Sequence, residues 1–345
     1  MTKQFPDRQR LLEMANGFRA ACLLAAAAEL DVWSAVGSRA LSAAEVAERI
    51  GGDLRATAML LDALVAIRVL EKEDDLYRVP VELRCLLIEP AAPEPLLPSE
   101  SSAEPILPML RHIANGQRAW SQLAWAVRAG FPAPRPASIR GWEADRASFI
   151  AAMHAICAPI ADGLVAELGP PQFSHLLDVG GASGTWTLAF LRAVPSATAT
   201  IFDLPHAIQM ARTRVASSGM AKRITLVSGD FYCDPLPAGA DLAWVSAIAH
   251  QHSRAHNRQL FSKVFSALVP GGRIAVRDIV MQPCRTLPAD GALFAINMLL
   301  NTETGGTFTF DEFAEDLQAA GFVDPQWVIR REDMNSVIVA QKPGA

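Results

Sequence analysis

The sequence predicts an α/β fold, in which a parallel sheet with helices on both faces follows a smaller, mostly helical domain. From Leu176 onward, apolar strand-like segments alternate with helical ones, as in sheets whose crossover connections are helices. The first such segment ends in an acid and a small-residue loop, Asp178-Val179-Gly180-Gly181-Ala182-Ser183-Gly184. The candidate strands centre on Leu177, Thr200, Thr225, Leu242, Ile274 and Val337.

The N-terminal segment has the order helix, turn, helix, hairpin. Residues 8–36 have an apolar, helical pattern, and Ser42 with Glu45 forms a capping-box signature for a short helix that glycine ends. Asp53 is placed to cap the next helix, and residues 69–79 are typical of a short hairpin. Together these features predict a winged-helix domain over residues 1–95.

Charge argues against DNA as the partner of this winged domain. Residues 1–95 hold 11 Lys and Arg against 15 Asp and Glu, a net charge of 11 − 15 = −4, which a phosphate backbone would repel. The apolar helix around Leu11 and Phe18 is better explained by packing against a second subunit. Burial against the chain's own second domain is the alternative.

A segment rich in proline and serine follows the winged domain and favours irregular backbone, with prolines at 90, 93, 95, 98, 105 and 108. Helices resume near Met109, are interrupted over 131–136, and continue as a long helix over 142–168. The predicted organisation is therefore a winged domain over 1–95, a connecting segment over 96–140, and a sheet domain over 141–345.

Composition is that of an ordinary globular chain. The 345 residues are 51% hydrophobic with a net charge of −5, which gives no electrostatic reason to bind nucleic acid or an anionic membrane. The apolar run over 20–28 is too short to span a bilayer, and no signal peptide is evident. Five scattered cysteines show no C-x-x-C pair, so we expect a cytoplasmic protein with no disulfide framework and no metal site.

The glycine loop after Asp178 predicts a nucleoside cofactor. Gly180, Gly181 and Gly184 supply backbone without Cβ atoms where a bulky cofactor would approach. A dinucleotide fingerprint would need glycine where Ala182 and Thr185 stand, which disfavours NAD and a dehydrogenase. S-adenosylmethionine (SAM) carries no phosphate and needs only such a loop, with acids for its hydroxyls and amines.

Three acids recur where such a cofactor would need them: Asp178, Asp203 and Asp230. Asp203 follows Asp178 by one helix and one strand, the position from which an acid binds ribose hydroxyls. Any one of these acids alone is more often a cap or a strand-end turn, but the register of all three favours a binding site.

These motifs resemble the SAM-dependent O-methyltransferases of the caffeic-acid, flavonoid and acetylserotonin type, over residues 10 to 342. The matching segments are 178–184, 202–205, 229–231, 270–273 and the winged-helix start. The resemblance implies an N-terminal dimerisation domain, a Rossmann-like methyltransferase domain and a homodimer. It also implies a cofactor site made of Asp178, Gly180, Gly181, Gly184, Asp203, Leu204, Gly229, Asp230, Phe231 and Ser246.

The resemblance places the catalytic base at His250, after an apolar strand, and an orienting acid at Asp278. A hydroxyl becomes a better nucleophile as its proton leaves, and an imidazole held by an acceptor takes that proton. Gln251 and His252 depart from the His-Asp-Trp run of the family, and we expect His252 and His256 to be surface or cap residues.

The second acid of the family is replaced by Thr307, whose hydroxyl cannot stabilise an imidazolium as a carboxylate would. The acceptor is expected to be a small, flat, apolar molecule. Residues that match acceptor-binding positions of the family, for which core packing is the alternative, are Phe149, Met153, Asn297, Met298 and, in this site, Thr307.

Two other functions stay open from the sequence. One is methyl transfer to a sulfur, carbon or carboxylate acceptor, in which proximity alone suffices. The other is a SAM-binding regulator without catalysis, which would bind the cofactor but show no turnover.

Overall fold

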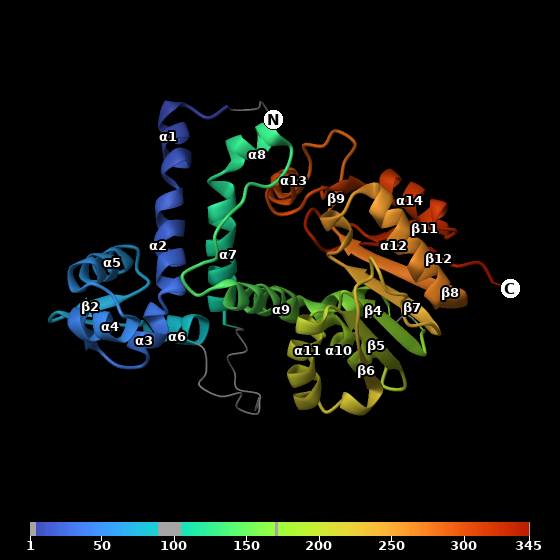
Figure 1. The fold of residues 1–345 in the computed structure, drawn as a ribbon, viewed down its shortest axis with the longest axis horizontal. Coiled ribbons are helices and arrows are strands. Elements are labelled where there is room, and N and C mark those ends of the chain that lie inside the picture. The colour runs from blue at the N-terminus through green and yellow to red at the C-terminus, as the bar shows by residue number, and fades with distance from the viewer. Residues whose placement is uncertain (1–4, 89–104, 170–171, 345) are drawn as a thin grey trace. The chain divides into compact units, whose positions relative to one another are not determined.

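The computed structural model describes residues 5–88, 105–169 and 172–344, and the chain forms two compact units (Figure 1). The first unit comprises residues 1–118 and 136–155, and the second comprises 119–135 and 156–345. The long helix α9 (Trp142–Glu167) contributes residues to both units. The boundaries predicted at residues 95 and 141 stay predictions, and the prolines at 90, 93, 95 and 98 lie outside the described residues.

The first unit begins with helices that the sequence predicted as one helical region. That region is divided at Gly17 and again at Asp31, whose backbone is left-handed with φ 56°. The hairpin joins a short strand in a three-stranded sheet of order β1-β3-β2. The elements are α1 (Arg8–Asn16), α2 (Phe18–Glu29), α3 (Val32–Val36), β1 (Leu41–Ser42), α4 (Ala43–Ile50), α5 (Leu54–Ala66), β2 (Glu71–Glu73), β3 (Leu76–Arg78), α6 (Val81–Leu87) and α7 (Leu107–Trp120), whose last two residues belong to the second unit.

Local signals set the ends of these helices as predicted. The Ser42 hydroxyl accepts the Glu45 N–H, and the Glu45 carboxylate accepts the Ser42 N–H at 2.8 Å, so the capping box is confirmed. Asp53 caps α5 through the Ala56 N–H at 2.8 Å. Each cap satisfies backbone donors that the first helical turn leaves free.

The second unit is built on a seven-stranded sheet of order β11-β12-β8-β7-β4-β5-β6. Strands β4 to β8 run parallel, and β12 pairs antiparallel with both of its neighbours, β8 and β11. All six predicted strands are confirmed, and the edge strand β11 is an addition. The strands are β4 (His175–Val179), β5 (Thr198–Asp203), β6 (Ile224–Ser228), β7 (Ala240–Ser246), β8 (Leu268–Asp278), β11 (Val323–Ile329) and β12 (Ser336–Gln341).

Helices cover both faces of this sheet, which confirms the predicted α/β class (Figure 1). A parallel pair of two-residue strands, β9 and β10, lies beside the main sheet. The remaining elements are α8 (Leu123–Ala129), α10 (Thr185–Ala193), α11 (Pro205–Ser217), η1 (Ala221–Arg223), η2 (Ala249–Gln251), α12 (Arg254–Ala267), β9 (Val280–Met281), α13 (Ala289–Asn301), β10 (Phe308–Thr309) and α14 (Phe310–Ala319).

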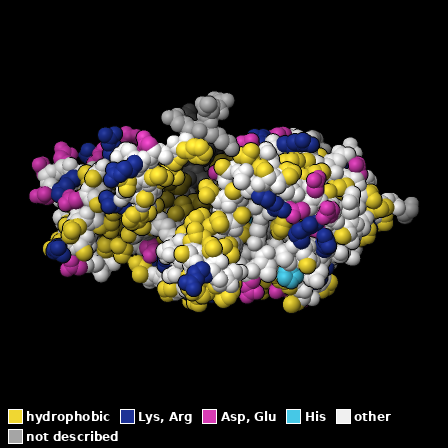
Figure 2. All heavy atoms as spheres, turned by 90° about the horizontal axis from the view of Figure 1, so that it is seen from above, with side chains coloured by type: hydrophobic (Ala, Val, Ile, Leu, Met, Phe, Trp, Pro, Cys, Tyr) yellow, Lys and Arg dark blue, Asp and Glu magenta, His cyan; other side chains and the backbone are white. Residues whose placement is uncertain are grey.

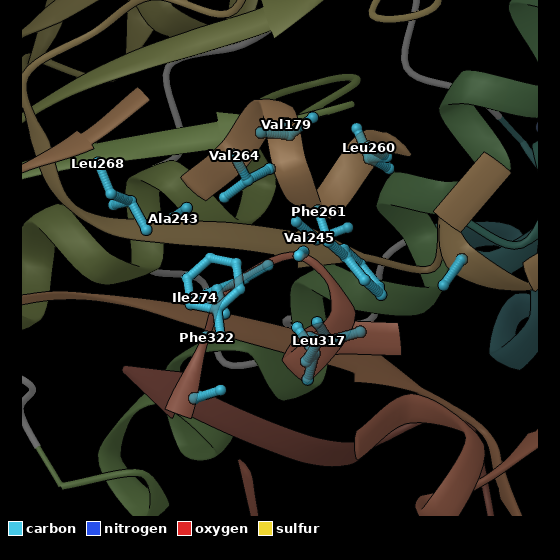
Figure 3. Close-up of a cluster of buried hydrophobic side chains, with 14 of the residues drawn as sticks. Val179, Ala243, Val245, Leu260, Phe261, Val264, Leu268, Ile274, Leu317 and Phe322 are labelled. Carbon is cyan, nitrogen blue, oxygen red and sulfur yellow. The ribbon is translucent and has the colours of Figure 1, made fainter. Parts of the chain in front are cut away.

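The core of the second unit holds the strand ends in place. On one face, Leu260, Phe261 and Val264 of α12 pack toward Val245 of β7, and Figure 3 shows these side chains in one apolar layer. On the other face, α10 packs Phe190 against Trp244 at a ring distance of 5.1 Å. A strand end fixed by packing on both faces supports precise placement of the residues that follow it.

The surface in view in Figure 2 has charges of both signs scattered among exposed apolar side chains. Two helical segments, Arg8–Glu29 and Trp142–Glu167, are long and apolar enough to cross a membrane by length and composition alone. The first of these segments extends well beyond the apolar run over 20–28, which alone is too short to span a bilayer. Helices that pack in a core or against a subunit satisfy the same criterion.

Candidate active site

The carboxyl ends of five parallel strands meet at one edge of the sheet. From β4, the chain adds β5 and β6 on one side of the sheet. It then returns to add β7 and β8 on the other side of β4. The crevice at such a reversal is where α/β sheets bind their ligands. The glycine loop follows β4, Ser246 ends β7, His250 follows it in η2, and Asp278 ends β8.

The glycine loop is closely packed against its neighbours. Gly180 has φ +69°, and a Cβ there would lie 2.5 Å from the Ile248 Cδ1, so only glycine fits. A Cβ on Gly181 would meet the Asp178 carboxyl at 2.8 Å. This packing leaves no room for a side chain at Gly180 or Gly181, so the loop offers bare backbone there as a glycine cradle, which fits the close approach of a nucleoside cofactor.

Asp203 lies at the end of β5 and is bonded to this loop. Its Oδ2 accepts the Ala182 N–H at 2.7 Å, and its Oδ1 accepts the Leu204 N–H at 2.7 Å. Each oxygen keeps a free lone pair, which is what two ribose hydroxyls require. Leu204 beside it is exposed, so an apolar side chain is available to a bound base.

Asp230 and Phe231 begin the turn after β6. The Asp230 Oδ1 accepts the Tyr232 N–H at 2.9 Å, and Gly229 donates its N–H to the Asp203 carbonyl at 3.0 Å. This bond ties the end of β6 to the end of β5, so the two acids lie at neighbouring strand ends.

Asp178 lies beneath the loop and not on its surface. It is 1% exposed, and its carboxylate accepts the Thr187 hydroxyl at 2.6 Å. Burial raises the pKa of Asp178 to about 7. Its position is that of a support for the loop, in contrast to Asp203.

His250 and Asp278 form a buried pair, as the sequence predicted. The His250 Nδ1 lies 2.8 Å from the Asp278 Oδ1, and the backbone N–H of His250 donates to Oδ2 at 3.2 Å. Oδ1 also accepts the Ile279 N–H at 2.8 Å. A carboxylate only accepts, so Nδ1 carries the proton and Nε2 keeps a lone pair that can take a proton from a substrate.

Two surroundings of His250 were not predicted from the sequence. The ring of Phe294, from α13, lies perpendicular to the imidazole at 4.8 Å. The Gly306 N–H donates to the His250 carbonyl at 2.9 Å, and a Cβ on Gly305 would lie 2.5 Å from that carbonyl. The glycine pair in the sequence was the available signal, since glycine permits such an approach.

The residues beside His250 differ in their placement. The Gln251 side chain bonds the Ala247 carbonyl at 2.9 Å, and His256 lies in the first turn of α12, whose cap is Ser253. His252 is buried and is the C-cap residue of η2, so of the two expected positions, surface or cap, it takes the cap; its Nδ1 bonds the Tyr232 hydroxyl. Burial lowers the pKa of His252 to about 4, so the ring is neutral at pH 7.

The predicted acceptor residues divide between the two units. Asn297 and Met298 lie on α13 with Phe294, and Thr307 is buried directly after the glycine pair that bonds His250. The Asn297 Oδ1 accepts the Trp120 Nε1–H at 3.3 Å.

Phe149 and Met153 lie on α9 within the first unit, where the Phe149 ring contacts His112 at 5.1 Å. Among the described residues, no group of three or more potential metal ligands occurs.

Similarity to known proteins shows the family to which this chain belongs. Residues 125–323 match the O-methyltransferase domain model, and residues 12–79 match the O-methyltransferase dimerisation domain model. A 3-hydroxy-5-methyl-1-naphthoate 3-O-methyltransferase of Streptomyces sahachiroi is 30% identical over 315 residues, which cover 90% of this chain and 88% of that protein.

The chain belongs to the O-methyltransferase family. The acetylserotonin O-methyltransferase of Gallus gallus is 28% identical over 94% of this chain and 95% of its own length. The human N-acetylserotonin methyltransferase, solved with SAM, has a TM-score of 0.78 at 25% identity, over 99% of this chain and 100% of that one. PigF, solved with SAH, has a TM-score of 0.81 at 26% identity, over 98% and 100%.

The chain is therefore a SAM-dependent O-methyltransferase with a dimerisation domain. Membership in this family rules against the regulator without catalysis and the dehydrogenase. The methyltransferase has the predicted cofactor, and the glycine cradle with Asp203 at its side fits that cofactor's nucleoside.

Proposed function

We propose that this methyltransferase transfers the methyl group of SAM to a hydroxyl of a small aromatic acceptor, with His250 as general base and Asp278 as its orienting residue. The observation that carries the proposal is the buried pair, in which Asp278 holds Nδ1–H and leaves the Nε2 lone pair free. The proposal rests on geometry, since general bases act within hydrogen-bond reach of the proton they remove.

In the proposed methyl transfer, the cofactor and the residues around His250 each have a separate role. Bound SAM supplies the methyl group: the bond from sulfur to carbon breaks as the bond from oxygen to carbon forms. The His250 Nε2 takes the hydroxyl proton, and the Asp278 carboxylate stabilises the imidazolium that results. Phe294 fixes the plane of the imidazole from the side of α13.

For the cofactor we propose that Asp203 accepts the ribose hydroxyls and Asp230 the exocyclic amine, with Leu204 and Phe231 against the adenine. Gly180, Gly181, Gly184 and Gly229 keep the backbone close to the cofactor, and Asp178 supports the loop from below.

An aromatic acceptor is supported by the relatives and by the residues near His250. One relative is named for a hydroxynaphthoate and another for a tetracenomycin polyketide. Phe294 and Met298 of α13 are apolar, and the amide N–H groups of Asn297 donate to no residue in the described part of the chain. Thr307 offers a neutral hydroxyl in place of an acid. Phe149 and Met153 stay sequence-based predictions for acceptor binding.

Thr307 also bears on which acceptors suit the site. With one carboxylate beside the imidazole instead of two, we propose that the enzyme favours acidic hydroxyls such as phenols that carry electron-withdrawing groups. Such acceptors need less help from a base.

The test is transfer of label from methyl-labelled SAM to matched panels of phenols, aliphatic alcohols and aromatic thiols. We expect turnover with phenols and little with alcohols of the same shape. Transfer to the thiols but not to the phenols would overturn the oxygen acceptor, and equal transfer to phenols and alcohols would overturn the aromatic hydroxyl.

A further inference from the structure

The strand β8 carries an arginine inside the second unit. Arg277 is 2% exposed, and its guanidinium lies over the Trp186 ring at 4.7 Å. Nε and Nη2 donate to the Asn335 Oδ1 at 3.0 and 2.7 Å, and Nη1 donates to the Ser246 Oγ at 3.1 Å. The acceptors in these bonds are neutral.

No carboxylate of the described residues lies within ion-pair distance of this guanidinium, although two acids are near. Both acids bond other groups: Asp278 bonds the His250 ring, and Asp333 accepts the Asn335 N–H at 2.8 Å. Burial lowers the pKa of Arg277, and the nearby Cys157, Asp278 and Asp333 act against that shift. A buried cation without a counter-charge is costly, and an anion bound nearby would offset that cost.

The arginine is placed at the cofactor edge of the sheet. Arg277 and Ser246 are paired residues of β8 and β7, next to the reversal of chain connections between β7 and β4. Ile248, two residues after Ser246, contacts Gly180 of the cofactor loop. Trp186 is the second residue of α10, the helix that this loop opens. The cation therefore lies between the loop helix and the end of β7.

The Ser246 hydroxyl has a defined direction in this arrangement. Because the Arg277 Nη1–H donates to Oγ, the hydroxyl's own hydrogen is left to donate elsewhere. Ser246 is half-buried at the end of β7, whereas Arg277 is 2% exposed, so of the two side chains the serine is the more accessible to a ligand. A serine polarised by a buried cation is a good donor to an anion.

We propose that Ser246 and Arg277 recognise the carboxylate of the methionine part of the cofactor. Ser246 donates the hydrogen bond to that carboxylate. Arg277 is a positioning residue that orients the serine hydroxyl and supplies the positive potential. The inference rests on SAM as the cofactor and is independent of the proposed roles of His250 and of the acceptor.

The test compares two ligands by calorimetric binding to the full-length protein: S-adenosylhomocysteine and its decarboxylated analogue, which keeps the amine and the nucleoside. Ser246→Ala and Arg277→Met are the variants. Arg273→Met is the matched control, an arginine of the same strand that donates to the Gln172 carbonyl at 3.1 Å, away from the strand's carboxyl end.

The wild type is expected to bind S-adenosylhomocysteine about tenfold or more tightly than the analogue. Ser246→Ala and Arg277→Met should each weaken S-adenosylhomocysteine about tenfold and change the analogue less than twofold. Arg277→Lys should restore part of the difference, because it keeps the charge but not both hydrogen bonds. Arg273→Met should leave both affinities unchanged.

Equal weakening of both ligands in Arg277→Met would make the arginine a structural residue only and overturn the proposal. Equal affinity of the wild type for the two ligands would overturn it as well. Should Arg277→Met fail to fold, Ser246→Ala decides by the same comparison. Since no turnover is measured, loss of activity in a His250 variant leaves this result unaffected.

Discussion

Replacing Asp278 by asparagine removes one negative charge from the active site and keeps nearly the same shape. Three N–H groups donate to the carboxylate, one from each of the His250 ring, the His250 backbone and Ile279. Oδ1 accepts two of them, so the asparagine oxygen is expected at that position. The imidazole then keeps its tautomer, and besides the charge the change removes only the bond from the His250 backbone N–H to Oδ2, which an amide nitrogen cannot accept.

The magnitude follows from the separation of the two groups. Unit charges about 4 Å apart interact by about 4 kcal/mol at an effective dielectric constant near 20. The neutral asparagine still accepts the Nδ1–H, so we expect a net loss of about 3 kcal/mol from the transition state. That corresponds to a fall in kcat of about 10²-fold. The affinity for S-adenosylhomocysteine should be unchanged, because Asp278 bonds His250 and Ile279 and has no proposed role in binding the cofactor.

The assay is label transfer under single-turnover conditions, with thermal unfolding as the check on folding. Asp316→Asn is the matched control: this acid is also buried in the second unit, but it pairs with Arg254 at 2.8 Å and Arg258 at 2.6 Å. It should lower Tm without changing kcat. Asp278→Asn should add little in a His250→Ala background, since the two residues act as a unit. Additive effects, or a fall below threefold in the single variant, would refute the reasoning.

Three further predictions concern stability and assembly. The folded-state pKa of Asp178 is raised from 3.8 to about 7, so the wild type loses stability as pH rises between these values, and the shift corresponds to about 4 kcal/mol. The Tm of Asp178→Asn relative to the wild type should therefore be higher at pH 8 than at pH 5; a difference independent of pH would contradict this. Gly180→Ala should cost about 1–3 kcal/mol of unfolding free energy in denaturant titrations, and adding Ile248→Ala should recover only part, because the positive φ remains. Leu11→Glu with Phe18→Glu should convert a dimer to monomers in light scattering, because these α1 and α2 side chains are 53% and 60% exposed; a dimer that survives would place the interface elsewhere.

Local signals in the sequence predicted much of the fold. The Ser42 capping box and the Asp53 cap act within three residues, so a short segment determines them. The buried strands were found because they are continuous apolar runs bounded by turns. The strand β11 was missed because Pro325 interrupts it and most of its residues are exposed, as edge strands allow.

The site was predicted where the chain order places residues at strand ends, and missed where distant segments meet. His250 follows the apolar strand β7 and Asp278 ends β8, and the resemblance to the O-methyltransferases assigned the roles of base and orienting acid to residues at these positions. Arg277 looks like an isolated charge in an apolar strand, since its partners Ser246 and Asn335 are 31 and 58 residues away. The contact of Gly306 with His250 likewise depends on tertiary packing.

The role of His250 as general base is the central claim, and a series of phenols with falling pKa tests it most directly. The ratio of kcat/KM between the wild type and His250→Ala is measured for each phenol, with methyl-labelled SAM at saturation. We expect a ratio of about 10² or more for phenols that stay protonated at the assay pH, falling toward one for phenols already ionised there. A ratio that stays constant across the series would contradict proton removal by His250.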